Sequence, residues 1–165
     1  MYIPEIPDNE LKSQLEELVY IARKVEDEVD AEDWLSLKFR FNSPVSEIEI
    51  KEFEGSFGIN LPSGYVDFLR FSNGAKLCGN IAIFDDIDRI ARMNKLSKSP
   101  DFPKDYITIA SIIGDGEILC FSKQTGKFIR YFDGREIVFD NFYAVFEWIL
   151  MFIKESAEEY VELEY

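Results

Sequence analysis

The residues of this chain that could support chemistry are almost all carboxylates. The sequence has 32 Asp and Glu residues, no His and two Cys. Without His, the Ser-His-Asp and Cys-His pairs that activate a nucleophile cannot form, and the commonest metal ligand is missing. Cys78 and Cys120 are too few for a closed zinc site. Cys120 lies in an apolar run, which is typical of a small core residue.

One run of carboxylates has the spacing of a cation site, Asp85-Asp86-Ile87-Asp88. It lacks the Gly at position six and the Glu at position twelve that an EF-hand loop requires. A strand that ends here, followed by a helix with an Asp cap, explains the run without a metal. No GxxxxGK[ST] or GxGxxG run offers a phosphate cradle. We therefore expect no catalytic residue, no metal and no cofactor.

The composition predicts one domain over residues 1–165. With 47% hydrophobic residues and 15 Phe, the chain has ample core material, because a domain of this size buries about 68–70% of its unfolded surface. Strand patterns cluster in the middle and helix patterns at both ends, which predicts an α+β fold. We expect an antiparallel or mixed twisted sheet of four to six strands in a meander. Helices from the N-terminal half and a C-terminal helix should flank it.

Apolar spacing and turn residues place the individual elements. The segment 27–33, dense in carboxylates, is expected to be a turn. The segment 34–41 alternates as a strand does, with a second short helix carrying Trp34, Leu35 and Lys38 as the alternative. Helices are expected over 9–28, from Ser46 to Gly58, from Pro62 to Asn73, over 86–96 and after a cap at Asp140; the other strands over 80–84, 106–113, 117–122, 127–132 and 135–139.

The stretch from Glu47 to Ala75 is the most informative part of the chain. Ser46 and Glu49 fit a capping box, in which each satisfies a backbone amide of the other. Gly58 suits the left-handed residue just past a helix end, where a side chain would be strained. One face of this helix is apolar because its large residues recur at helical spacing: Ile50, Phe53 and Phe57.

A second helix follows at once. Pro62 suits its first turn, because the missing N–H would have no partner there. Tyr65, Phe68 and Leu69 form its buried stripe. Asn73-Gly74 supplies positive φ and is expected to end the helix.

Together these residues resemble the signature of the SUKH superfamily, the Smi/Knr-like proteins. The best match spans residues 44–153, after an N-terminal helix and lead-in at 1–43 and before an acidic tail at 154–165. The resemblance implies an α+β fold and the role of an immunity protein in a bacterial polymorphic toxin system. The signature residues are assigned to folding: Phe53, Gly58, Leu61, Pro62, Tyr65, Phe68, Leu69, Asn73 and Gly74.

The net charge of −14 bounds the partner. Nucleic acid and anionic membranes both require a basic surface, so direct binding to either is not expected. A basic protein is favoured, because opposite charge can raise association rates by about 10–10³. With the resemblance, this predicts a cognate toxin domain, a nuclease being one candidate, whose active site the carboxylates cover. The alternative is that acidity only keeps the chain soluble.

The candidate toxin contacts lie on expected loops and strand ends, where binding residues concentrate. They are Glu32, Asp33, Asp85, Asp86, Asp88, Asp115 and Glu117. The clusters at 26–33 and 155–164 are typical of solvated faces, and the first is also a candidate partner surface.

Two other functions stay open at this stage. A regulatory or scaffold protein of the same superfamily would bind a partner without a toxin, and a hydrolase would use two carboxylates in a deep pocket. The chain has no run of about 20 apolar residues, the length that a bilayer span requires. The first residues lack the features of a signal peptide. We expect a cytoplasmic protein that is a monomer or a weak homodimer.

Overall fold

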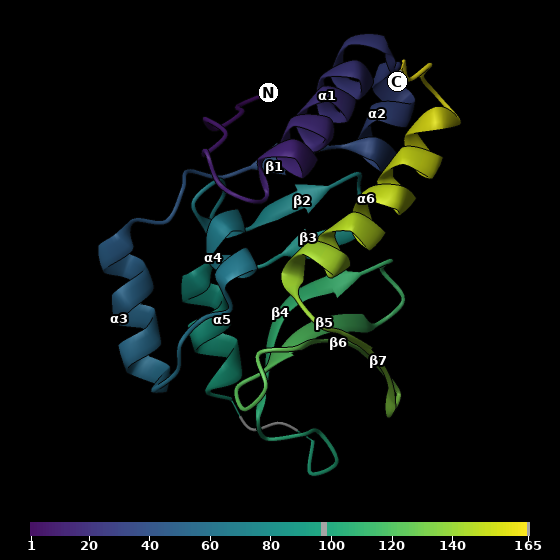
Figure 1. The fold of residues 1–165 in the computed structure, drawn as a ribbon. Helices are drawn as coiled ribbons and strands as arrows, with labels where there is room; N and C mark the ends of the chain where they lie inside the picture. Colours follow the sequence, from purple (N-terminus) through teal and green to yellow (C-terminus); the bar gives the residue numbers. More distant parts are fainter. Residues whose placement is uncertain (97–98, 165) are drawn as a thin grey trace.

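The computed structural model describes residues 1–96 and 99–164, and within them it contains six helices and one sheet of seven strands (Figure 1). The helices are α1 (Lys12–Glu28), α2 (Ala31–Leu37), α3 (Glu47–Phe57), α4 (Ser63–Leu69), α5 (Ile87–Asn94) and α6 (Phe142–Glu158). The strands are β1 (Arg40–Phe41), β2 (Ala75–Leu77), β3 (Ala82–Phe84), β4 (Tyr106–Ile112), β5 (Glu117–Ser122), β6 (Phe128–Phe132) and β7 (Arg135–Phe139). None of these helices combines the length and the apolar character that a bilayer span needs. Tyr165, the last residue of the expected tail, lies outside the described residues.

The sheet is an antiparallel meander in which each strand pairs with the next one along the chain. This confirms the α+β prediction, with one strand more than the predicted range. The missed strand is β2, whose three residues are too few for a pattern of alternation to be read from sequence. Helix α6 lies across one face of the sheet, and α1 packs along α6 (Figure 1).

The segment 34–41 corrects the first expectation, because most of it is not a strand. Helix α2 occupies Ala31–Leu37, and only Arg40–Phe41 joins the sheet. Asp30 begins the helix, with its carbonyl accepting from the amides of Asp33 and Trp34. The expected turn at 27–33 shrinks to a short break between α1 and α2. The helix alternative is confirmed, although the side chain of Leu35 lies outside what the structure describes.

The first signature helix forms as predicted. In α3, Ser46 and Glu49 make both bonds of the capping box, at 2.7 and 3.2 Å. Gly58 ends the helix in the left-handed region at φ 63°. Along α4, Tyr65, Phe68 and Leu69 are buried. The predicted stripes therefore face the core.

Three predicted helix boundaries are wrong, the first being the start of α1, which lies at Lys12 and not at residue 9. Helix α4 ends at Leu69, and Asn73 lies beyond it, where its side-chain carbonyl accepts from the amide of Ile87 at 2.9 Å. Gly74 does have positive φ, 75°, and a Cβ there would lie 2.8 Å from the Phe84 carbonyl oxygen. The Asn-Gly pair thus joins the start of β2 to the start of α5. At the other end, Asn141 rather than Asp140 caps α6.

Phe68→Ala should lower the free energy of unfolding by about 3–5 kcal/mol, because the ring is fully buried and its removal leaves a cavity. Urea denaturation followed by circular dichroism measures the change. Ile48→Ala, at a residue that is 71% exposed on α3, is the control and should change stability by less than about 0.5 kcal/mol. A midpoint unchanged by Phe68→Ala would contradict the assignment of this residue to folding.

Tyr65→Phe should leave the protein as stable or make it more stable. The Tyr65 hydroxyl is buried without a hydrogen-bond partner among the described residues, and an unsatisfied buried group costs about 1–3 kcal/mol. The matched control is Tyr143→Phe, because the Tyr143 hydroxyl donates to Asp67 at 2.8 Å. That variant should lose stability. Equal losses in both variants, measured by urea denaturation, would show that the Tyr65 hydroxyl is satisfied.

Candidate functional site

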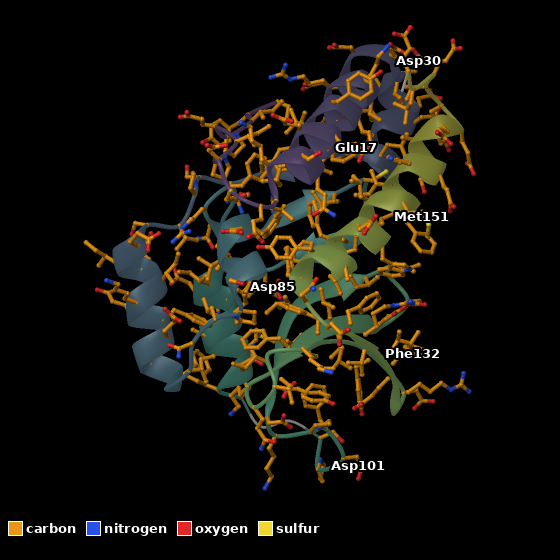
Figure 2. All side chains as sticks on the ribbon, in the orientation of Figure 1. Glu17, Asp30, Asp85, Asp101, Phe132 and Met151 are labelled. Carbon is orange, nitrogen blue, oxygen red and sulfur yellow. The ribbon has the colours of Figure 1, made fainter. Side chains whose placement is uncertain are left out.

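The predicted contact residues do not converge on one surface. Strands β3 and β4 are antiparallel, with Phe84 opposite Ala110 and Ala82 opposite Ile112. Asp85 therefore follows one end of this strand pair, whereas Asp115 lies at the other end. Glu32 and Asp33 are in the first turn of α2. Figure 2 shows the separation, with Asp85 near the centre of the molecule and Asp30, which begins α2, at its upper end.

The Asp85–Asp88 run has the structural role that its sequence suggests. Asp86 caps α5 by accepting from the Arg89 amide at 2.8 Å. Asp85 forms an ion pair with the Arg89 guanidinium at 2.9 Å, and its side chain is only 22% exposed. Asp88 is exposed in the first turn of the helix. Among the described residues, no three Asp, Glu, Cys or His side chains gather as ligands for a cation.

Burial sets the ionisation of Asp85. Desolvation raises the pKa of this carboxyl, and the neighbouring charge of Arg89 opposes the shift without cancelling it. A carboxyl with a raised pKa is disfavoured in its charged form. Burial thus works against the charged form of the Asp85 carboxyl.

Glu117 is taken up by an internal ion pair. Only 8% of the residue is exposed, and its carboxylate accepts from the Arg130 guanidinium. That guanidinium lies 3.8 Å from the centre of the Trp148 ring, which connects β5 and β6 to α6. Asp115 accepts from the Glu117 amide at 3.0 Å and stays exposed at the hairpin turn. Glu117 therefore offers a partner little free surface.

The structure joins two acidic clusters that are far apart in the sequence. Helices α1 and α6 pack together with their C-terminal ends on the same side (Figure 1). Residues 26–33 and 155–164 together hold eleven carboxylates and no Lys or Arg. We call these two segments the acidic pole. Its acidic residues are Glu26, Asp27, Glu28, Asp30, Glu32, Asp33, Glu155, Glu158, Glu159, Glu162 and Glu164.

The C-terminal tail is held against α1 at this pole. The Glu164 amide donates to the Tyr20 hydroxyl at 3.1 Å, and Val161 is buried in the core. The hydrogen bond with Glu28 raises the pKa of the Lys24 ammonium, and the negative charge of Glu164 adds to that effect. The tail carboxylates thus share one surface with the end of α1.

Few cations neutralise the pole. Glu26 binds the N-terminal amine at 2.6 Å, and Glu28 binds Lys24 at 2.9 Å. Asp30, Glu32 and Asp33 are exposed and take part in no ion pair within residues 1–96 and 99–164. Trp34 follows Asp33 in the chain, and the Lys38 ammonium lies 4.7 Å from the centre of the Trp34 ring.

A groove of about 520 Å³ runs between α1 and α6. Two of the residues along it are acidic, Glu17 and Glu147. Lys154, which also lines the groove, binds the carboxylate of Glu17. A pair of free carboxylates, as a hydrolase of the acid–base type requires, is therefore not presented there.

The match to a known family decides what kind of protein this is. The pattern of the SMI1/KNR4 family (SUKH-1) matches residues 44–148, from just before α3 into α6. The chain belongs to this family. It is also similar to YnaB, an uncharacterized protein of Bacillus subtilis (strain 168), with 26% identity over 130 residues that span 76% of this chain and 88% of YnaB.

SUKH proteins are generally non-catalytic immunity proteins that bind protein partners. In this SUKH-1 chain the matched region holds α3, α4 and α5 and every strand from β2 to β7. Both segments of the acidic pole lie outside it. Sequence reasoning named the two clusters separately and did not join them, because no signal along the chain shows that the C-terminal tail returns to α1.

Asp85→Asn should stabilise the protein most at neutral pH. Because the folded-state pKa of Asp85 is raised above the ordinary value of 3.8, stability from its neutral form is lost as pH rises through the raised pKa. The amide has no charge to desolvate, so the stability difference between variant and wild type should shrink as pH falls from 7 toward 3.8. Urea denaturation at a series of pH values measures it.

Asp88→Asn is the matched control, because it removes the same charge from an exposed position in the first turn of α5, three residues after Asp85. Its effect should depend less on pH. A difference for Asp85→Asn that grows as pH falls would mean that Arg89 outweighs burial.

Proposed function

We propose that this protein is an immunity protein that binds a cognate toxin domain and neutralises it with the acidic pole. Family membership supports a protein partner, and the convergence of segments 26–33 and 155–164 carries the choice of surface. The partner is a basic toxin domain in the cytoplasm of the producing cell. A nuclease suits the chemistry, because carboxylates can take the place of phosphates on a basic active-site face.

The charge of the pole suits rapid capture of a toxin. Eleven carboxylates from two short segments produce a local field that attracts a basic partner before contact, and such steering can raise association rates by about 10–10³. A toxin must be captured before it acts, so the rate of association matters as much as the final affinity. Screening by salt should slow this association.

The pole is also built on rigid parts. Glu32 and Asp33 are in a helix, and the tail is held by Val161 and by the bond to Tyr20. Surfaces that are already ordered lose less entropy on binding. Trp34, half-buried next to these carboxylates, is the type of residue that contributes most to interfaces. We assign Glu32, Asp33 and Trp34 to the centre of the toxin contact.

The sequence also predicts toxin contacts at Asp85, Asp86, Asp88 and Asp115. We rank these positions below the pole as contact residues. Asp85 and Asp86 are committed to Arg89 and to the cap of α5. Asp88 is exposed on α5, away from the pole, whereas Asp115 lies near it, because the neighbouring Ile113 lines one cavity with Ser156 of the pole. Asp88 and the exposed Glu52 of α3 line a common pocket and therefore serve as a comparison pair of equal charge in the experiment below.

Reversing charge at the pole should weaken toxin binding. The toxin is first identified by pull-down from the source cells and by the gene next to this one. Glu32→Lys with Asp33→Lys should slow association with the purified toxin domain at least about tenfold at low salt. Stopped-flow kinetics over a range of NaCl concentrations measures the rate, and the wild-type rate should fall as salt rises.

The control is Asp88→Lys with Glu52→Lys, which makes the same change in net charge away from the pole. It should slow association much less than the pole variant does. Equal effects would show that only total charge matters and would remove the pole as the contact surface. A purified toxin that this protein neither binds nor inhibits would overturn the proposed function itself.

A further inference from the structure

Strand β7 leaves a long edge of the sheet free. Its five residues pair with β6 without a register shift, from Phe132 opposite Arg135 to Phe128 opposite Phe139. No strand lies on its other side in the described part of the chain. The opposite edge, β1, has two residues only. Natural sheets shorten, charge or cover such edges, because unpaired backbone groups recruit other strands.

The strand β7 carries two exposed charges, Arg135 and Glu136, but it also exposes apolar side chains. Ile137 is 52% exposed and Val138 is 54% exposed. Neighbouring residues of a strand point to opposite faces, so the edge is apolar above and below the sheet. Phe132, at the end of β6, is 44% exposed. Exposed apolar groups that gather in this way mark interaction surfaces.

On one face, the exposed residues continue the core. Ile137 pairs with Arg130, which pairs with Leu119, a core residue. Helix α6 covers this row as far as Trp148, whose ring lies 6.1 Å from that of Phe139. Ile137, at the far end of this row, is left half-exposed. On α6 itself, Met151 is 47% exposed, and Figure 2 shows Met151 and Phe132 on the same side of the molecule.

The backbone of β7 is arranged for a symmetric pairing. Asp133 and Gly134 have φ values of 47° and 76°, which is typical of a two-residue hairpin turn of type I′. In such a hairpin the pair next to the turn exchanges both hydrogen bonds, and the pattern then alternates. Arg135, Ile137 and Phe139 therefore direct their backbone groups at β6. Glu136 and Val138 direct theirs outward.

This edge also carries little net charge. Residues 117–139 contain four Lys and Arg and three Asp and Glu, although the whole chain has a net charge of −14. The acidic pole lies at the α1–α2 end of the molecule, away from β7 (Figure 1). Two copies that meet at β7 keep their acidic poles apart. Repulsion is thereby smaller than in any contact that involves the pole.

We propose that β7 pairs with β7 of a second copy in an antiparallel, two-fold symmetric dimer. The outward backbone N–H and C=O groups of Glu136 pair with those of the partner's Val138, and those of Val138 pair with those of the partner's Glu136. Ile137 lies opposite the partner's Ile137. A two-fold interface needs one patch that complements itself, and this register provides it. Ile137, Phe132 and the ring of Trp148 gain apolar neighbours, so the dimer extends both the sheet and the core. This inference does not depend on the proposed toxin contact, which uses another surface.

Cross-linking tests the register directly. Residues opposite each other in a non-hydrogen-bonded antiparallel pair have Cα atoms about 4.5 Å apart, within the range for a disulfide. Ile137→Cys should therefore form a disulfide between copies under mild oxidation, seen as a dimer on a non-reducing gel. The native Cys78 and Cys120 are buried and should not cross-link. Ile48→Cys on α3 is the control and should stay monomeric. No dimer from Ile137→Cys, or equal dimer from both, would overturn the proposal.

Sedimentation equilibrium on the full chain tests the association itself. The mass should rise from 19.2 kDa toward twice that value between about 1 µM and about 1 mM protein. Val138→Pro removes an outward N–H without touching the bonds to β6, and Ile137→Lys sets two charges opposite each other. Each should weaken association at least about tenfold, whereas Ile48→Lys, with the same charge change, should not.

Salt separates this dimer from toxin binding. Because the copies carry like charge and meet through apolar and backbone groups, added NaCl should strengthen dimerisation by screening repulsion. The acidic pole should lose affinity for a basic toxin under the same conditions. A wild-type protein that stays monomeric at every concentration and salt level would overturn the dimer and leave β7 to the strand of another protein or to solvent. The toxin proposal would be unaffected.

Discussion

The ring of Phe142, in the first turn of α6, holds the layers of this protein together. It is fully buried and contacts Tyr65 and Phe68 of α4, Phe84 of β3 and Phe128 of β6, with ring centres 5.3 to 6.0 Å apart. Residues from four elements thus meet at one side chain. Aromatic rings bury large areas and prefer tilted contacts, so this cluster sets the position of α6 on the sheet. The position of α6 in turn determines where both candidate surfaces lie.

At its C-terminal end, α6 brings its carboxylates beside α1. Like charges gathered in this way repel one another and destabilise the folded chain. Two contacts hold the C-terminal tail in place despite that cost. The side chain of Val161, within the tail, is buried in the core, and the Glu164 amide donates to the Tyr20 hydroxyl. A concentration of charge maintained against repulsion by specific contacts is better explained by a basic partner than by solubility, since carboxylates spread over the surface would serve solubility as well.

The outer side of α6 creates the second surface. Trp148 closes the core over β6 by stacking on Arg130, whose charge is balanced by the nearly buried Glu117. Past this point the helix stops covering the sheet, and β7 extends beyond it. The two surfaces differ in chemistry, because one is charged and the other is apolar with free backbone groups. We therefore propose different partners for them, with opposite dependence on salt.

Local signals in the sequence determined the class of fold and most of its elements. The capping box at Ser46, the glycine at Gly58 and the alternating strands after Tyr106 depend on neighbours within a few residues. Such signals also gave the family, because the signature between Phe53 and Gly74 is itself local. They failed where tertiary contacts decide: α2 forms where alternation predicted a strand, and Asn73 accepts from the Ile87 amide at the start of α5 instead of ending α4.

The candidate site could be predicted only in pieces. Glu32 and Asp33 were predicted as partner contacts, and both acidic clusters were visible in the sequence. Composition alone cannot show that residues 26–33 and 155–164 become neighbours, since more than 120 residues separate them and the packing of α1 on α6 joins them. Glu117 was indistinguishable from an exposed carboxylate until its pairing with Arg130 was known. The sequence thus determined the fold, the charge and the absence of histidine chemistry, whereas the tertiary structure decided which charges are free and which edges are open, because both depend on contacts between residues distant in the chain.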